Sequence, residues 1–149
     1  GKTFSIVVPE KIEQIIEEGQ ALKHCLDSSD RYFERIANQE SYIVFLRRTK
    51  AMEQPYYTLE IEPDGTTRQK RTVGDNQNND YHRAEKFLKK WQAAIRPRLS
   101  QEDFERQEIS RQLRMYELES LRNDKVTVHG GIHAGELLAD ILEADLMEA

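Results

Sequence analysis

The chain has 149 residues and a formal net charge of −5, with 33% charged against 38% hydrophobic residues, a composition that fits one domain with an economical core. Its longest apolar run, Ile43 to Leu46, is far shorter than the roughly 20 residues that span a bilayer, and no apolar signal-peptide core opens the sequence, so we expect no membrane contact. The single cysteine, Cys25, excludes an internal disulfide and a multi-cysteine zinc site and fits a reducing, cytoplasmic location.

The N-terminal part predicts a strand and two helices. Phe4 to Val8 has the composition of a short strand, and Pro9 suits the first turn of a helix. The apolar residues of that helix follow the 3.6-residue period: Ile12, Ile15, Ile16, Leu22 and Leu26. Ser28 to Asp30 offers N-cap residues for a second, short helix that ends near Asn38.

The middle of the chain predicts three further strands. Tyr42 to Leu46 is β-branched and aromatic without alternation, which is typical of a strand buried on both faces. Tyr56 to Glu62 alternates between apolar and polar residues, so we expect one face in the core and the other outward or in a cleft. Pro63-Asp64-Gly65 indicates a turn, and Thr66 to Val73 returns as a polar strand, which completes a β-meander.

The C-terminal part predicts helices. Gly74 to Asp80 has a loop composition, and the helix after it has the apolar stripe Tyr81, Ala84, Phe87, Leu88, Trp91 and Ile95 and ends before Pro97. Ser100 and Asp103 form a capping-box pattern for a helix to about Arg122, with a thinner stripe of Phe104, Ile109, Leu113 and Tyr116. A short last helix follows Gly130-Gly131.

The expected fold class is therefore α+β, with an antiparallel β-meander of three to four strands packed against several amphipathic helices. We expect residues 1–98 to form the α+β core. Residues 99–149 are expected to form a helical extension that packs on or beside it.

Charge is unevenly distributed along the sequence. Nine basic and three acidic residues lie between Arg68 and Arg98, whereas twelve acidic and five basic residues follow from Ser100 onward. A basic segment of this kind is more often a solvated helix face than a nucleic-acid site, and both interpretations stay open here.

His24 and Cys25 offer a nucleophile beside a base, because a thiolate needs a nearby proton acceptor or positive charge. Neighbours on a regular helix point about 100° apart, so these two side chains do not easily reach each other. The alternative is a small buried cysteine beside a structural histidine.

The hairpin offers a second group of polar residues, whose pairing depends on the turn. A two-residue Asp64-Gly65 loop places Glu60 opposite Gln69 and Thr58 opposite Arg71, and so gathers a possible site on one face. A three-residue Pro63-Asp64-Gly65 loop with a bulge at the glycine places Glu60 opposite Arg68 and Thr58 opposite Lys70 instead, as surface ion pairs.

His129 and His133 are four residues apart, with Glu136 three further on, a spacing that binds metal on one continuous helix. Gly130 and Gly131 lie between the histidines and argue against such a helix. The sequence therefore predicts no metal and no cofactor.

Four segments have the motifs of a known family. They read EGQALKHCLDSSDRY from Glu18, then IVFLRR, then QPYYTLEIEPDGTTRQKRTVGDNQN, and finally FLKKW. Their order and spacing resemble the C-terminal domain of PcfJ-like proteins, with a glycine-led helix ending in His-Cys, a strand ending in Arg, a Pro-Tyr-x-Thr-Leu-Glu strand, and a Gln-x-Arg strand before an Asn-bearing loop. The resemblance covers about half of the chain, from Glu18 to Trp91.

The resemblance implies a protein encoded on conjugative plasmids, integrative elements or phages, and it nominates site positions. The candidate catalytic residues are His24, Cys25, Glu60 and Gln69, and the candidate substrate-binding residues are Arg47, Thr58, Arg71 and Asn76. The chain departs from the family pattern at Leu26-Asp27, where Val-Gly is expected, and at Thr72, where glycine is expected. Both departures remove a position for a tight backbone turn.

Three functional hypotheses follow. The leading one is an accessory domain of a mobile genetic element that binds or acts on nucleic acid, with Lys86, Lys89 and Lys90 as phosphate contacts. The second is an enzyme that uses Cys25 or Glu60, with an arginine holding an anionic substrate. The third is a protein–protein interaction module that docks a partner through the acidic C-terminal helices.

Overall fold

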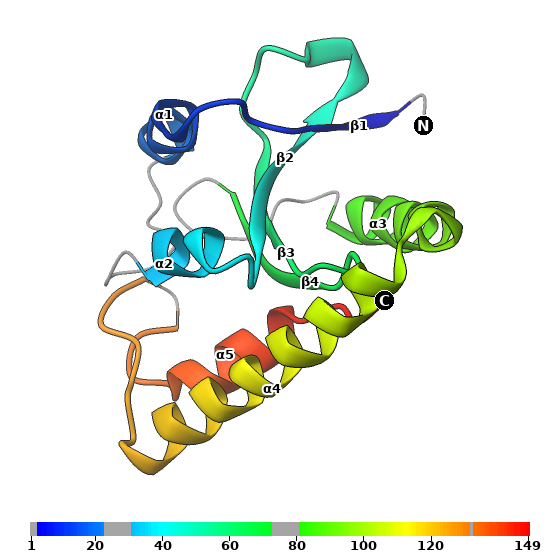
Figure 1. The fold of residues 1–149 in the computed structure, drawn as a ribbon. Helices are drawn as coiled ribbons and strands as arrows, with labels where there is room; N and C mark the ends of the chain where they lie inside the picture. Colours follow the sequence, from blue (N-terminus) through cyan, green and yellow to red (C-terminus); the bar gives the residue numbers. More distant parts are fainter. Residues whose placement is uncertain (1–2, 23–30, 73–80, 132) are drawn as a thin grey trace.

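A four-stranded antiparallel sheet forms the centre of the molecule (Figure 1). The computed structural model describes residues 3–22, 31–72, 81–131 and 133–149. The strands are β1 (Phe4–Val7), β2 (Tyr42–Arg48), β3 (Tyr57–Ile61) and β4 (Thr67–Arg71), and they lie side by side in chain order. This is the predicted meander, and with the surrounding helices it confirms the α+β fold class.

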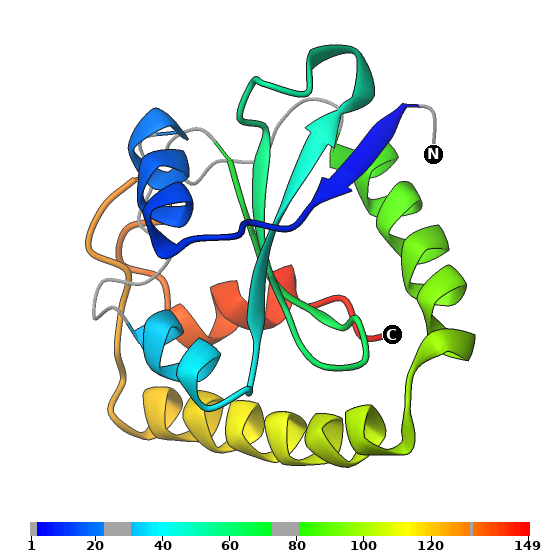
Figure 2. The same cartoon turned by 45° about the horizontal axis from the view of Figure 1, so that its top comes forward.

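Five α-helices surround the sheet (Figure 2). They are α1 (Ile12–Leu22), α2 (Arg31–Ala37), α3 (Tyr81–Ile95), α4 (Gln101–Asn123) and α5 (Leu138–Asp145). Within the described ranges, the short 3-10 helices Thr49–Ala51 and Arg96–Arg98 extend β2 and α3. No helix in the described part of the chain is long and apolar enough to cross a membrane.

β2 is buried on both faces, as its unbroken apolar run predicts. Val44 and Leu46 point into a core that contains Leu59 of β3 and Leu88 of α3. Ile43 and Phe45 point to the opposite face, where they pack with Ile15 of α1 and Ile36 of α2. The sheet is therefore covered by α3 on one side and by α1 and α2 on the other.

β3 alternates as its sequence predicts, but its polar face is not open to solvent. Tyr57 and Leu59 lie in the core under α3. On the other face Thr58, Glu60 and Glu62 are buried as well, with exposed fractions of 0%, 2% and 1%. Hydrogen bonds from residues of α2 and α4 reach this face. Its carboxylates must therefore find partners inside the protein.

α4 begins at the predicted capping box, because the Ser100 hydroxyl accepts from the Asp103 backbone and the Asp103 carboxylate accepts from the Ser100 backbone. The thin apolar stripe of this helix is not its packed face. Ile109, Leu113 and Tyr116 are exposed, whereas a polar stripe is buried in their place: Gln107, Ser110 and Arg114. The reason is that the sheet presents charged groups to α4, and polar side chains satisfy them.

The C-terminal segment is fastened to the sheet beyond α5. Thr67 and Met147 exchange two backbone hydrogen bonds of 2.8 Å each, and the buried Gln92 amide donates to the carbonyl oxygens of Gly65 and Met147. Residues on both sides of position 98 thus share one packed unit. The division of the chain at that position remains a prediction.

The turn between β3 and β4 requires a glycine. Gly65 has φ +93°, and a Cβ atom placed there would lie 2.7 Å from Cδ1 of Ile95. We expect Gly65→Ala to lower the free energy of unfolding by about 1–3 kcal/mol, since it combines a left-handed backbone with a steric overlap. Urea denaturation measures this change.

The matched control for Gly65→Ala is Gly130→Ala. No heavy atom lies within 4 Å of a Cβ built at Gly130, so this variant should unfold at the midpoint of the parent protein. Equal midpoints for the two variants would contradict the assignment of a strained turn at Gly65.

Candidate functional site

The β3–β4 hairpin combines features of both predicted arrangements. The Glu62 amide donates to the Thr66 carbonyl at 2.8 Å, so the loop has three residues. Ile61 nevertheless pairs with Thr67 while Glu60 pairs with Gln69, so Arg68 is an extra residue in a bulge. The bulge restores the predicted pairs Glu60 with Gln69 and Thr58 with Arg71. It also turns Arg68 toward the carboxylates of β3.

Glu60 accepts a hydrogen bond at every available position of its carboxylate. Arg35 of α2 donates from Nε to Oε2 at 2.6 Å and from Nη2 to Oε1 at 2.9 Å. Ser41 donates to Oε2 at 2.5 Å, and Gln69 donates to Oε1 at 3.1 Å. An ionised carboxylate has about four acceptor sites, so this one is filled by protein groups.

Glu62 is held in the same way by the bulge and by α4. Arg68 donates from Nε to Oε2 at 2.7 Å, and Arg114 donates from Nε to Oε2 at 2.8 Å and from Nη2 to Oε1 at 3.2 Å. Gln107 adds a hydrogen bond to Oε1 at 2.9 Å. α4 is therefore joined to the hairpin by polar contacts.

Arg68 connects the two carboxylates. Its Nη1 donates to Glu40 at 2.6 Å and lies 3.9 Å from Oε2 of Glu60. Burial alone would lower the pKa of Arg68, but the charges of Glu60 and Glu62 and the hydrogen bonds to Glu40 and Glu62 outweigh it and raise the pKa. This guanidinium is therefore permanently charged.

These contacts define a buried ion cluster of three arginines and three glutamates. Its members are Arg35, Glu40, Glu60, Glu62, Arg68 and Arg114. These six side chains carry three positive and three negative charges, and Glu117 and Glu148 form further ion pairs with Arg35 and Arg114. The cluster joins α2, β3, β4 and α4 at one place.

The cluster encloses very little space. A cavity of about 20 Å³ lies beside Arg35, Arg68, Gln69 and Arg114, and three leucines and Glu117 complete its wall. This volume holds about one water molecule. Oε1 of Gln69 is buried without a hydrogen-bond partner among the described residues, so a single water is the natural occupant. The cavity is too small for a substrate.

Arg47 belongs to a separate buried ion pair. Its guanidinium holds the Glu18 carboxylate of α1 through both terminal nitrogens, with Nη2 to Oε1 at 2.7 Å. Its Nε donates to the Met52 carbonyl at 3.1 Å, and the guanidinium lies over the Phe45 ring. The predicted anion-binding residue thus binds a carboxylate of its own chain.

Arg71 and its neighbour Lys70 contact α5. Nη1 of Arg71 lies 3.3 Å from the Asp145 carboxylate, and Nζ of Lys70 donates to the Asp145 carbonyl at 2.7 Å. Burial lowers the pKa of Lys70, and the nearby charges of Asp145 and Glu85 only partly offset this effect. These cations fasten the C-terminal helix to the sheet edge.

The structure brings some of the predicted site residues together. Glu60 and Gln69 share a hydrogen bond, and Thr58 and Arg71 are paired across the strands, whereas Arg47 contacts α1. His24, Cys25 and Asn76 lie outside the described residues, so their relation to this face is not defined. The catalytic and substrate-binding roles of all eight positions remain predictions.

The sequence reading missed several members of the buried ion cluster. These members are Arg35, Glu40 and Arg114. They lie on helices or in a turn, and the sequence around each of them gives no indication that its charged side chain is buried. One signal was present: Gln107, Ser110 and Arg114 follow the i, i+3, i+7 spacing of a single helix face.

The lysines nominated for phosphate contacts lie on α3, on the far side of the sheet from the cluster. Lys86, Lys89 and Lys90 are all exposed, and Lys89 donates to the Glu148 carbonyl at 2.9 Å. Across the described ranges, no group of three or more His, Cys, Asp or Glu side chains could hold a metal ion. His133 instead contacts Glu136 at 2.7 Å.

Removing one charge from the cluster should destabilise the fold strongly. We expect Glu60→Gln to lower the free energy of unfolding by roughly 3–5 kcal/mol, because Arg35 loses its buried counter-charge. Urea denaturation followed by circular dichroism measures the loss. Glu108→Gln, which removes a carboxylate from an exposed pair with Arg111, serves as the control and should change little. Comparable stability of both variants would show that the cluster does not support the fold.

Comparisons with known proteins agree with the motif pattern. The family model for PcfJ-like protein matches residues 1–86. An uncharacterized protein of Listeria innocua is 27% identical over 93 residues, which cover 62% of this chain and 20% of that protein. This chain thus corresponds to about a fifth of that relative's length. No solved structure matches. Because the family model covers more than half of the sequence, the chain belongs to the PcfJ-like protein family.

Proposed function

We propose that this PcfJ-like domain is an accessory domain of a mobile genetic element and binds nucleic acid through the outer face of α3. The genetic context is the one that the family resemblance implies. The observation that carries the binding proposal is a row of cations on α3 for which no described residue supplies a carboxylate partner.

The cations of the basic segment differ in burial and in their partners. Arg68 and Lys70 are buried and contact carboxylates of the cluster or of α5. Arg83, Lys86 and Lys90 are exposed, and no described carboxylate lies within ion-pair distance of them. The three exposed cations of α3 can meet phosphates, whereas Arg68 and Lys70 cannot.

The spacing on α3 suits a phosphate backbone. Arg83, Lys86 and Lys90 follow the i, i+3, i+7 positions of one helix face, so the row spans about 10 Å at 1.5 Å per residue. Successive phosphates of one DNA strand advance about 3.4 Å along the duplex axis. The row therefore matches a stretch of roughly three phosphates.

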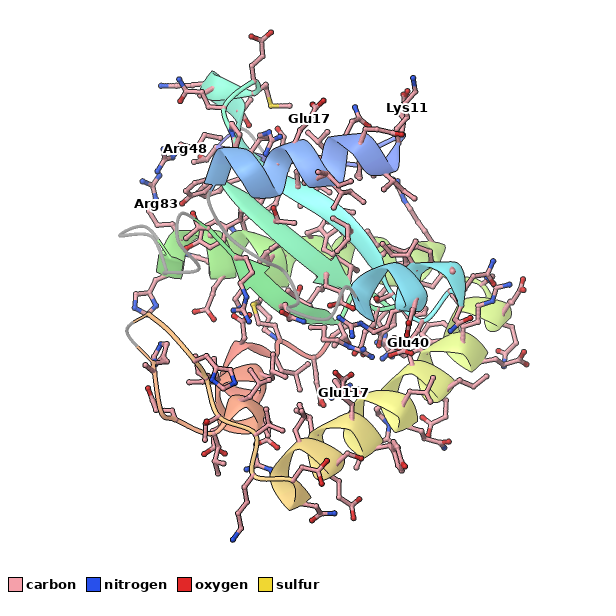
Figure 3. All side chains as sticks on the ribbon, turned by 90° about the vertical axis from the view of Figure 1, so that its left-hand side faces the viewer. Lys11, Glu17, Glu40, Arg48, Arg83 and Glu117 are labelled. Carbon is pink, nitrogen blue, oxygen red and sulfur yellow. The ribbon has the colours of Figure 1, made fainter. Side chains whose placement is uncertain are left out.

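The apolar face of α3 packs on the sheet and so keeps the basic face turned outward. Ala84 and Leu88 are buried against the sheet, and Phe87 and Trp91 pack beside them. The helix cannot rotate its basic face inward without exposing these side chains. Figure 3 shows Arg83 at the edge of the molecule, well away from α4.

The buried ion cluster favours a binding function over an acid–base function for this face. A general base needs a free lone pair within reach of a substrate proton, whereas the carboxylate of Glu60 is filled by Arg35, Ser41 and Gln69. In this proposal the cluster supports the fold, and α3 provides the contact surface.

A fluorescent oligonucleotide tests the proposal. We expect salt-dependent binding that weakens in the triple variant Arg83→Gln, Lys86→Gln, Lys90→Gln. For duplex DNA each lost phosphate contact should reduce the slope of log affinity against log salt by about 0.9, so the triple variant should lose two to three units. Fluorescence anisotropy at several salt concentrations measures both quantities.

A second triple variant controls for net charge. Lys11→Gln, Lys50→Gln, Lys125→Gln removes three exposed lysines that lie off α3, so it changes the net charge equally. It should bind nearly as well as the parent protein. Equal loss in the two variants, or no association even at low ionic strength, would overturn the proposed role of α3.

A further inference from the structure

We propose that the groove between α2 and α4 binds an amphipathic helix of a basic partner protein. This surface is separate from the outer face of α3, so the inference does not rest on the nucleic-acid proposal. Three observations support it: a groove of adequate size, an exposed apolar stripe along one wall, and an acidic rim.

The groove has a volume of about 370 Å³. The end of α2 forms one wall and the C-terminal half of α4 forms the other, with Leu113, Tyr116 and Leu121 among the lining side chains. Figure 3 shows Glu40 and Glu117 in the region where the two helices approach each other. The part of α4 from Ile109 to Asn123 is about 21 Å long at 1.5 Å per residue, which accommodates a helix of similar length.

The apolar stripe of α4 runs along this wall. Ile109, Leu113 and Tyr116 follow the i, i+4, i+7 spacing and are 60%, 44% and 72% exposed. α4 cannot bury them against its own sheet, because that side of the helix is used by Gln107, Ser110 and Arg114 for the polar contacts. A row of apolar side chains at this spacing is the surface that a helix-in-groove partner recognises.

The rim of the groove selects a positively charged partner. Its lining includes four carboxylates, from Glu34, Glu40, Glu117 and Asp124, and the guanidinium of Arg35. Glu40 pairs with Arg68 and Glu117 pairs with Arg35, so the charge offered to a partner comes from the other two carboxylates. Glu34 and Asp124 are exposed and form no ion pair with any described residue. The C-terminal carbonyl groups of α4, at the Asp124 end, add further negative potential.

The same charges argue against other occupants. Nucleic acid would place its phosphates against the carboxylates. A second copy of this chain has a net charge of −5, and its basic helix α3 has its apolar face buried in the core. A basic amphipathic helix satisfies both the apolar stripe and the rim.

The probe is a fluorescein-labelled 18-residue peptide of leucine, lysine and alanine, with its leucines on one helical face. We expect it to bind this domain. The double variant Leu113→Ser, Tyr116→Ser should weaken binding about tenfold or more, because it removes apolar area from the contact. Glu34→Gln with Asp124→Asn should weaken binding at low salt and have little effect at high salt.

Two controls define specificity. Met52→Ser with Met115→Ser removes two exposed apolar side chains away from the groove, since Met115 lies on the opposite side of α4 at 100° per residue. This variant should bind as tightly as the parent. A peptide of the same composition in scrambled order, without an apolar face, should bind at least about tenfold more weakly.

Three results would overturn the proposal. One is equal affinity for the ordered and scrambled peptides. Another is unchanged affinity of the Leu113→Ser, Tyr116→Ser variant. The third is self-association of the parent protein in sedimentation experiments that this variant abolishes, which would identify a second copy as the occupant. Circular dichroism confirms that each variant is folded.

Discussion

The structure depends on two carboxylates of one buried strand face. Glu60 and Glu62 lie beneath α2 and α4, where an unpaired charge costs several kcal/mol, and the hairpin and two helices supply arginines to neutralise them. The bulge at Arg68 is part of this solution, because it adds a guanidinium between the carboxylates without shifting the pairs formed by Thr58 and Glu60. Ion pairs with these carboxylates thereby hold α2 and α4, which are far apart in the sequence, on the same face of the sheet.

The same interaction decides which face of α4 is exposed. Arg68 and Arg114 are buried in the cluster and are not available to a partner. The contacts of Gln107, Ser110 and Arg114 with the hairpin and the adjoining turn turn Ile109 and Leu113 outward. The exposed apolar stripe of α4 is thus a consequence of the buried cluster, whereas the orientation of α3 is fixed by its apolar contacts with the sheet.

Much of the fold follows from periodicity in the sequence. The unbroken apolar run of β2, the alternation of β3 and the stripe of α3 each report a local pattern, and the structure confirms them. The packed face of α4 cannot be predicted from periodicity. A hydrophobic pattern predicts burial of Ile109 and Leu113, whereas the helix buries polar side chains that bind a carboxylate about 50 residues away in the sequence. The register of the β3–β4 hairpin could not be predicted from local sequence for a similar reason. The bulge is stabilised by Glu40, Glu62 and Ser110, not by the turn residues themselves.

Hydrogen exchange in the variant Arg114→Met tests most directly whether the cluster holds α4 on the sheet. The substitution keeps an unbranched apolar stem at this position and removes the hydrogen bonds to Glu62. The account predicts faster exchange in α4 and in the β3–β4 hairpin, with protection of α3 unchanged, because α3 is held by apolar contacts. Unchanged protection of α4 would contradict the central role of the cluster.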